Sequence, residues 1–154
     1  MNENLMFSSK KQDWETPDDL FKDLNSEFNF SWDLAARKDN TKANNFISPE
    51  TNSLTVDWSK LEGNLFLNPP YGRELSKWIK KAYESSLERQ GNIVLLIPSR
   101  TDTSYWHNYI FGKAEIRFLR GRIKFENNGI AGDAAPFPSA IVIYNNDERW
   151  KSFK

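Results

Sequence analysis

The stretch GNLFLNPPYGR, residues 63–73, places an asparagine, two prolines and a tyrosine directly after a run of apolar residues. Neither Pro69 nor Pro70 has a backbone N–H to donate, so this segment can continue neither a strand nor a helix. The chain therefore leaves an apolar strand and stiffens at once, with Asn68 and Tyr71 held on a rigid corner. In open α/β sheets, ligands bind at the carboxyl ends of the strands, and this corner is such an end.

The segments on either side of this corner alternate between strand and helix patterns. The expected helices cover residues 16–28, 74–91 and 102–111, the first with Thr16 as its N-cap. The expected strands cover residues 30–36, 54–58, 63–67, 92–98, 114–119 and 138–144, with 122–125 as a further candidate. This alternation predicts an α/β fold with a mostly parallel sheet, whose last strands form a terminal hairpin at the edge because no helix separates them.

Length and composition are those of one domain. Of the 154 residues, 38% are hydrophobic and 14% are aromatic, which supplies a core of ordinary size. Residues 1–12 are polar, and we expect a flexible N-terminus there, ahead of a single domain at 13–154. No apolar run approaches the roughly 20 residues of a membrane helix, and the N-terminus does not have the pattern of a signal peptide. We therefore expect a soluble, cytoplasmic protein, located in the bacterial host if a phage encodes it.

The charge and the residue inventory exclude several classes of protein. The 21 basic and 21 acidic residues balance, so a strongly basic nucleic-acid binder is not indicated, although a local basic patch stays open. Without cysteine there is no disulfide, thiolate nucleophile or Cys-based zinc site, and a single histidine argues against a His-rich metal site. We expect no metal. The residue inventory also argues against a hydrolase, because the sequence has no cysteine, a single histidine and no Gly-x-Ser-x-Gly elbow.

Three polar residues, Asp33, Asp57 and Asn68, end successive apolar segments. In a parallel sheet they would meet at one edge, although strand-end Asp and Asn often serve only as loop caps. The Asn68 side-chain oxygen and the Pro69 carbonyl are two hydrogen-bond acceptors, and Tyr71 adds a flat ring. This set suits a planar exocyclic amine. Drawing its N–H groups out of plane localises the nitrogen lone pair for attack on an electrophilic carbon.

Asn68-Pro69-Pro70-Tyr71 resembles the [DN]PP[YFW] signature of amino-methyltransferases that use S-adenosylmethionine. The sequence is similar to the phage-type DNA N6-adenine methyltransferase family over residues 12–146, in the segments 13–36, 65–73, 77–84, 94–110, 115–125 and 134–144. The resemblance implies a Rossmann-like three-layer fold and methyl transfer from S-adenosylmethionine to the amine of a flipped adenine in double-stranded DNA. It implies that the catalytic residues are Asn68, Pro69, Pro70 and Tyr71, with Tyr71 stacking on the base.

The same resemblance implies a cofactor site. Its residues would be Trp14, Thr16, Pro17, Asp33, Ala35, Asp57 and Asn68. Most methyltransferases carry a glycine-rich turn after the first strand, whereas DLAARKDN, residues 33–40, has no glycine. Because glycine lets a backbone approach a ligand closely, this departure leaves the seat of the cofactor open.

Basic side chains are the expected contacts to DNA phosphates. The candidates are Arg73, Lys77, Arg100, Arg120, Arg122 and Lys124. A solvated helix face is the alternative for the cations at 73–81, whereas those at 117–124 surround a glycine turn and favour a functional patch. No segment is long enough for a separate target-recognition domain, so we expect specificity to come from the loops at 37–53 and 126–137.

Two other functions remain open from the sequence alone. An N-methyltransferase with this motif could act on RNA or on a protein amide, which a comparison of methyl acceptors would separate. A catalytically inactive nucleic-acid-binding relative would keep the fold without binding the cofactor, although the intact Asn68-Pro69-Pro70-Tyr71 argues against it. The sequence favours the DNA N6-adenine methyltransferase.

Overall fold

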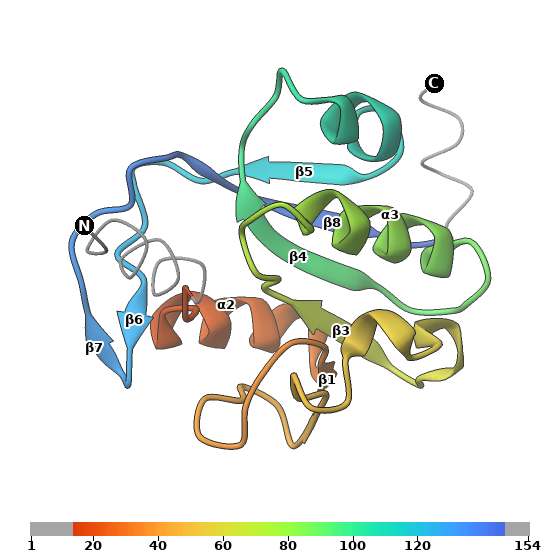
Figure 1. Ribbon diagram of the computed structural model, residues 1–154, viewed down its shortest axis with the longest axis horizontal. Helices are drawn as coiled ribbons and strands as arrows, with labels where there is room; N and C mark the ends of the chain where they lie inside the picture. Colours follow the sequence, from red (N-terminus) through yellow and green to blue (C-terminus); the bar gives the residue numbers. More distant parts are fainter. Residues whose placement is uncertain (1–13, 147–154) are drawn as a thin grey trace.

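A six-stranded sheet forms the centre of the computed structural model, which describes residues 14–146 (Figure 1). The strands lie in the order β2-β1-β3-β4-β8-β5. Their bounds are β1 Phe30–Asp33, β2 Asn45–Phe46, β3 Asn64–Leu67, β4 Ile93–Pro98, β5 Glu115–Phe118 and β8 Ser139–Tyr144. β1 pairs in parallel with β2 and β3, and β3 pairs in parallel with β4, whereas β8 runs antiparallel to both β4 and β5. The predicted α/β fold with a mostly parallel sheet is confirmed.

The end of the chain differs from the predicted edge hairpin. β8 is antiparallel to β5 as expected, but it lies inside the sheet, between β4 and β5. All six residues of β8 are buried, so the strand needs a neighbour on each side and cover on both faces. The connection from β5 to β8 carries a small separate hairpin of β6 (Glu126–Asn127) and β7 (Ile130–Ala131). The candidate strand at 122–125 is not formed; β6 begins directly after it.

The predicted strand at 54–58 is also wrong. Two short 3₁₀ helices, η1 (Ser53–Thr55) and η2 (Trp58–Lys60), occupy this region. Local hydrogen bonds compete with a sheet ladder here, because the Asp57 carboxylate accepts from the Ser59 backbone N–H at 3.1 Å. The edge position next to β1 goes instead to β2, which forms inside the predicted loop at 37–53.

Two α-helices pack on the sheet, α2 (Asp18–Phe28) and α3 (Leu75–Ser86). The ring of Phe21 in α2 lies 5.1 Å from that of Phe66 in β3, and the ring of Tyr83 in α3 lies 5.9 Å from that of Tyr144 in β8. The third predicted helix, 102–111, is mainly a single π-helical turn, η3 (Trp106–Ile110). The predicted flexible N-terminus, 1–12, falls outside the described residues. None of the helices seen between residues 14 and 146 is long and apolar enough to cross a membrane.

The predicted N-cap of α2 is incorrect by one residue. Pro17 occupies the N-cap position, and the carboxylate of Glu126 accepts from the Asp18 N–H at 3.4 Å. Thr16 lies one residue before the cap and is 3% exposed. Its hydroxyl is therefore available for a different contact, described below.

Gly63 directly precedes β3, and both its backbone conformation and its close approach to Ser31 disfavour a larger residue. Its φ is +85°, and a Cβ added there would lie 2.1 Å from Ser31 Oγ and 2.8 Å from Ser31 Cβ. We expect Gly63→Ala to lower the free energy of unfolding by about 2 kcal/mol in urea denaturation, since strain and overlap add. Gly121→Ala is the matched control, because Gly121 has a φ of +78° and open space around it. Equal losses in the two variants would show that the contact with Ser31 contributes nothing.

Candidate active site

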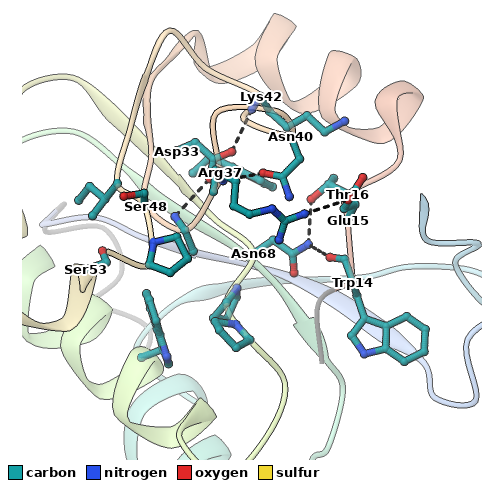
Figure 2. A pocket seen from close by; sticks show the side chains of 18 of the residues that line it. Trp14, Glu15, Thr16, Asp33, Arg37, Asn40, Lys42, Ser48, Ser53 and Asn68 are labelled. Carbon is teal, nitrogen blue, oxygen red and sulfur yellow. Dashed lines mark hydrogen bonds and ion pairs between the residues drawn. The ribbon is translucent and has the colours of Figure 1, made fainter. Parts of the chain in front are cut away.

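A pocket opens at the carboxyl ends of β1 and β3, beside the corner that Pro69 and Pro70 create (Figure 2). Three stretches of chain supply most of its wall: residues 14–16 ahead of α2, the long loop after β1, and the end of β3. The predicted site residues that line it are Trp14, Thr16, Asp33, Ala35, Asn68, Pro69 and Pro70. The sheet thus brings together most of the residues chosen from the sequence.

Asn68 follows the last residue of β3, and its side-chain amide has an asymmetric environment. The Nδ2 group donates to the Trp14 carbonyl at 2.5 Å and to the Thr16 hydroxyl at 3.0 Å. The Oδ1 atom is buried and accepts no hydrogen bond from the described residues. A buried acceptor without a partner is costly, so this oxygen is a candidate for binding an N–H group of a ligand.

Tyr71 lies outside the pocket wall. It is 6% exposed, and its hydroxyl donates to the Leu96 carbonyl at 2.9 Å, while burial raises its pKa well above the usual value. The rings of Phe125 and Phe137 pack against it edge to face, with centroids at 6.0 and 5.7 Å. In this arrangement Tyr71 belongs to an aromatic cluster next to the pocket.

Asp33 ends β1 and organises the loop that replaces a glycine-rich turn. Its two carboxylate oxygens accept from the backbone N–H groups of Ala35, at 3.3 Å, and Lys42, at 3.0 Å. The described loop residues 34–44 include no positive φ angle, so the backbone path needs no glycine. The missing glycines therefore do not prevent a pocket from forming here.

The buried carboxyl of Asp33 should make stability depend on pH. Burial raises its pKa from 3.8 to about 6, although the hydrogen bonds from Lys42 and Ala35 act in the opposite direction. The folded protein thus retains a proton that the unfolded chain releases, and the free energy of unfolding falls as pH rises from about 4 to about 6. We expect a loss of about 3 kcal/mol in urea unfolding, with a flatter profile for Asp33→Asn. Parallel profiles for the two proteins would contradict this assignment.

The sequence reasoning missed a polar part of the pocket wall. The Arg37 guanidinium lies 3.5 Å from the Glu15 carboxylate, which also accepts from the Asn128 backbone N–H at 3.1 Å. Ser48 and Ser53 line the same pocket (Figure 2). Most of these residues come from the loop at 37–53, whose unusual length was the available signal, since long loops in compact domains are often functional.

Two predicted cofactor residues do not line the pocket. Pro17 occupies the N-cap position of α2. Asp57 is exposed at the start of η2, where a hydrogen bond from Ser59 lowers its pKa. The strand that would have carried Asp57 to the site does not form, and this explains its position.

The predicted DNA-contacting cations are all exposed. Arg100 follows β4, and Arg120, Arg122 and Lys124 follow β5, so these four lie beyond the carboxyl edge that carries Asn68. The guanidinium of Arg100 lies over the ring of Phe137 at 5.7 Å.

The cations at the start of α3, and Arg117, have different surroundings. Arg73 precedes α3, and Lys77 pairs with Glu74 at 3.3 Å in the first turn. Arg117, in the same sequence cluster as Arg120, makes a bidentate contact with Glu27, both distances being 2.7 Å. Arg117 therefore joins β5 to α2.

The comparisons with known proteins agree with one another. The family described as DNA N-6-adenine-methyltransferase (Dam) matches residues 4–152 of the chain. A curated relative, the DNA N-6-adenine-methyltransferase of Haemophilus phage HP1 (strain HP1c1), is 31% identical over 156 residues, covering 96% of this chain and 88% of the relative. Within residues 14–146, no group of three or more His, Cys, Asp or Glu side chains is arranged to hold a metal ion.

Proposed function

The chain belongs to the DNA N-6-adenine-methyltransferase family, and from this premise we propose that the pocket beside Asn68 binds S-adenosylmethionine. The protein is an adenine-specific DNA methyltransferase, as the sequence predicted, and methyltransferases generally take their methyl group from that cofactor. The observation that carries the proposal is the pocket itself, which opens at the carboxyl ends of β1 and β3 directly beside Asn68, whose buried Oδ1 has no partner within the described residues.

The residues of the pocket fit the chemical groups of the cofactor. Of the residues predicted to bind it, Trp14, Thr16, Asp33, Ala35 and Asn68 line the pocket. The Thr16 hydroxyl accepts from Asn68, and the other four remain in the proposal as cofactor contacts. Arg37, beside Glu15, suits the carboxylate and ammonium of the amino-acid part, since the two side chains carry opposite charges. Ser48 and Ser53 offer hydroxyl groups for the ribose, and Ile47 and Trp78 give an apolar wall for the adenine ring.

The corner after β3 would act on the target amine by accepting its hydrogens. Asn68 Oδ1 and the Pro69 carbonyl hold the two N6–H groups and favour the nitrogen lone pair that attacks. When bound, S-adenosylmethionine would supply an electrophilic methyl group, whose bond to the sulfonium sulfur breaks as the N–C bond forms, so that the sulfur leaves as a neutral thioether. The two acceptors stabilise the positive charge that grows on N6 as the N–C bond forms, and the proton then leaves to solvent. For Tyr71 to stack on the adenine, the rings of Phe125 and Phe137 must first move aside.

Because the Oδ1 atom of Asn68 is buried, the target adenine must enter the protein to reach it. A base paired inside a duplex cannot bring its amine to a buried oxygen, so we propose that adenine flips out of double-stranded DNA. Arg100, Arg120, Arg122 and Lys124 would hold the phosphates on either side, because they lie beyond the same edge of the sheet. The segment at 126–137, with its β6–β7 hairpin, would contact bases. With DNA as substrate, the enzyme would work in the cytoplasm of the bacterial host.

The proposed architecture is the Rossmann-like fold with three layers. Tyr144 is directly opposite Ile93 in the sheet, and Ile93 is opposite Leu65, so these three side chains share one face. Phe66 is next to Leu65 and points to the other face. Since α3 contacts Tyr144 and α2 contacts Phe66, the two helices would cover opposite faces of the sheet.

The test is transfer of tritiated methyl from S-adenosylmethionine to duplex and single-stranded DNA, with calorimetry of cofactor binding alongside. We expect N6-methyladenine in the duplex, and a fluorescence increase on mixing the protein with a duplex that carries 2-aminopurine at the target position. Transfer only to single strands would contradict the duplex proposal, and label on RNA or protein would redirect the substrate. Absence of cofactor binding would overturn the pocket assignment.

The phosphate contacts are tested separately. We expect the double variant Arg120→Ala, Arg122→Ala to raise the KM for DNA about tenfold at moderate salt. It should also reduce the salt dependence of binding, because fewer counterions are released from DNA when fewer phosphates are neutralised. Lys60→Ala is the matched control, because Lys60 is an exposed cation in η2. Equal effects of the double variant and the control would show that general charge, and not this patch, governs binding.

A further inference from the structure

We propose that Thr16 is a positioning residue, which together with the Trp14 carbonyl fixes the Asn68 amide so that its oxygen, and not its nitrogen, meets the target amine. The sequence predicted Thr16 as a helix N-cap and as a cofactor-binding residue, not as a partner of Asn68. The inference rests on the proposed role of Asn68 as acceptor for the N6–H groups. It assigns to the segment before α2 a part in catalysis that acts through Asn68.

The orientation of the amide follows from the chemistry of its partners. A backbone carbonyl can only accept, so the atom of Asn68 that lies 2.5 Å from the Trp14 oxygen must be the NH₂ nitrogen. The Thr16 hydroxyl, at 3.0 Å, accepts the second hydrogen of the same group. Figure 2 shows the nitrogen directed at Trp14 and Thr16 and the oxygen directed away from both. Both donors of the amide are thus used by the protein, and its acceptor is left for a ligand.

The two acceptors are themselves held in place. Thr16 is 3% exposed. Between them, the Glu15 carbonyl accepts from the Glu126 backbone N–H at 3.0 Å. The segment therefore acts as a rigid clamp on Asn68, which keeps the amide from rotating to the opposite orientation.

This clamp has a consequence for the choice between Asn and Asp at the first position of the motif. An ionised carboxylate at position 68 would place an oxygen against the Trp14 carbonyl, where two acceptors repel each other. The [DN]PP[YFW] signature allows either residue, but in this chain the Trp14 carbonyl requires a donor. We therefore expect Asn68→Asp to be a poor enzyme, although it keeps an acceptor and nearly the same shape.

The test compares Thr16→Val, Thr16→Ser and Asn68→Asp in steady-state methyl transfer to duplex DNA, with cofactor binding by calorimetry and folding by circular dichroism. Valine keeps the shape of threonine without the hydroxyl. We expect Thr16→Val to lower kcat about tenfold while the Kd for S-adenosylmethionine changes less than about twofold, because the amide loses orientation and the pocket keeps its form. Thr16→Ser should recover most of the lost kcat. Asn68→Asp should lower kcat at least about 100-fold.

The outcomes separate this inference from the proposed function. If Asn68→Ala is fully active, the acceptor role of Asn68 fails and the clamp has no catalytic purpose. If Asn68→Ala is inactive but Thr16→Val matches the unchanged enzyme, only the positioning role is overturned. A large rise in the cofactor Kd for Thr16→Val would make Thr16 a cofactor ligand and would also overturn it. If Thr16→Val does not fold, Asn68→Asp provides the test. Wild-type activity of Asn68→Asp would show that no hydrogen-bond donor is required at position 68, and would overturn the inference.

Discussion

Replacing Asn68 with alanine is expected to lower kcat for methyl transfer to DNA by at least about 100-fold, which is the typical cost of losing one preorganised contact to developing charge. The variant removes the Oδ1 acceptor and leaves the Pro69 carbonyl as the one acceptor of the proposed pair. It also frees the Trp14 carbonyl and the Thr16 hydroxyl from their donor. The measurement is the initial rate of tritium incorporation at saturating cofactor and DNA.

The expected loss should appear in kcat more than in binding. We expect the KM for DNA to change little, because the proposed phosphate contacts lie elsewhere on the surface. Asn108→Ala is a matched control, since Asn108 is an exposed asparagine in η3. If Asn68→Ala raised KM and left kcat unchanged, Asn68 would bind ground state and transition state equally, and the charge-stabilising role would be refuted.

The largest loss of stability is expected from Trp58→Ala. Trp58 is 0% exposed, and its indole N–H donates to the Ser53 carbonyl at 3.1 Å and to the Ser53 hydroxyl at 3.0 Å. Its ring lies 6.0 Å from that of Trp78, and the Lys81 ammonium lies over it at 5.1 Å. Removing the ring leaves a large cavity, so we expect the free energy of unfolding in urea to fall by about 3–5 kcal/mol.

The effect of Trp58→Ala should reach the proposed cofactor pocket, because Ser53 and Trp78 both line it. We expect a weaker calorimetric affinity for S-adenosylmethionine even under conditions where the variant is folded. Trp58→Phe is the comparison variant: it keeps most of the packing and loses only the two hydrogen bonds to Ser53. A loss for Trp58→Phe as large as that for Trp58→Ala would mean that the hydrogen bonds, and not the packing, hold this region together.

The elements that could be predicted from the sequence are those with strong local signals. The apolar run before Asn68, the buried runs at β4 and β8 and the helical spacing in α2 and α3 each specify one structure. The region at 54–58 alternates as a strand would, but Trp58 turns inward to bond with Ser53. That contact depends on the fold around it, so it cannot be predicted from the local spacing of apolar residues.

The candidate site likewise contains residues that a local sequence signal identifies and contacts that only the fold creates. Asp33 and Asn68 were found because the first ends β1 and the second directly follows β3, at the same edge of the sheet, and Pro69 comes next in the motif. The hydrogen bond from the Asn128 backbone N–H to the Glu15 carboxylate joins residues far apart in the sequence, so no local pattern predicts it. Tyr71 satisfies the motif, yet the rings of Phe125 and Phe137, which arrive from the connection between β5 and β8, cover it. Position in a motif therefore identified the residue but not its surroundings.

The place of β8 between β4 and β5 has a consequence for how the protein is made. β8 spans Ser139–Tyr144 and follows both β4 and β5 in the sequence, so it leaves the ribosome after them. Until then β4 and β5 have no partner between them, and the apolar edge of β4 is open to pairing with other chains. The nascent enzyme therefore cannot complete its sheet until β8 has been made, and a chain broken off before residue 139 should aggregate instead of methylating DNA.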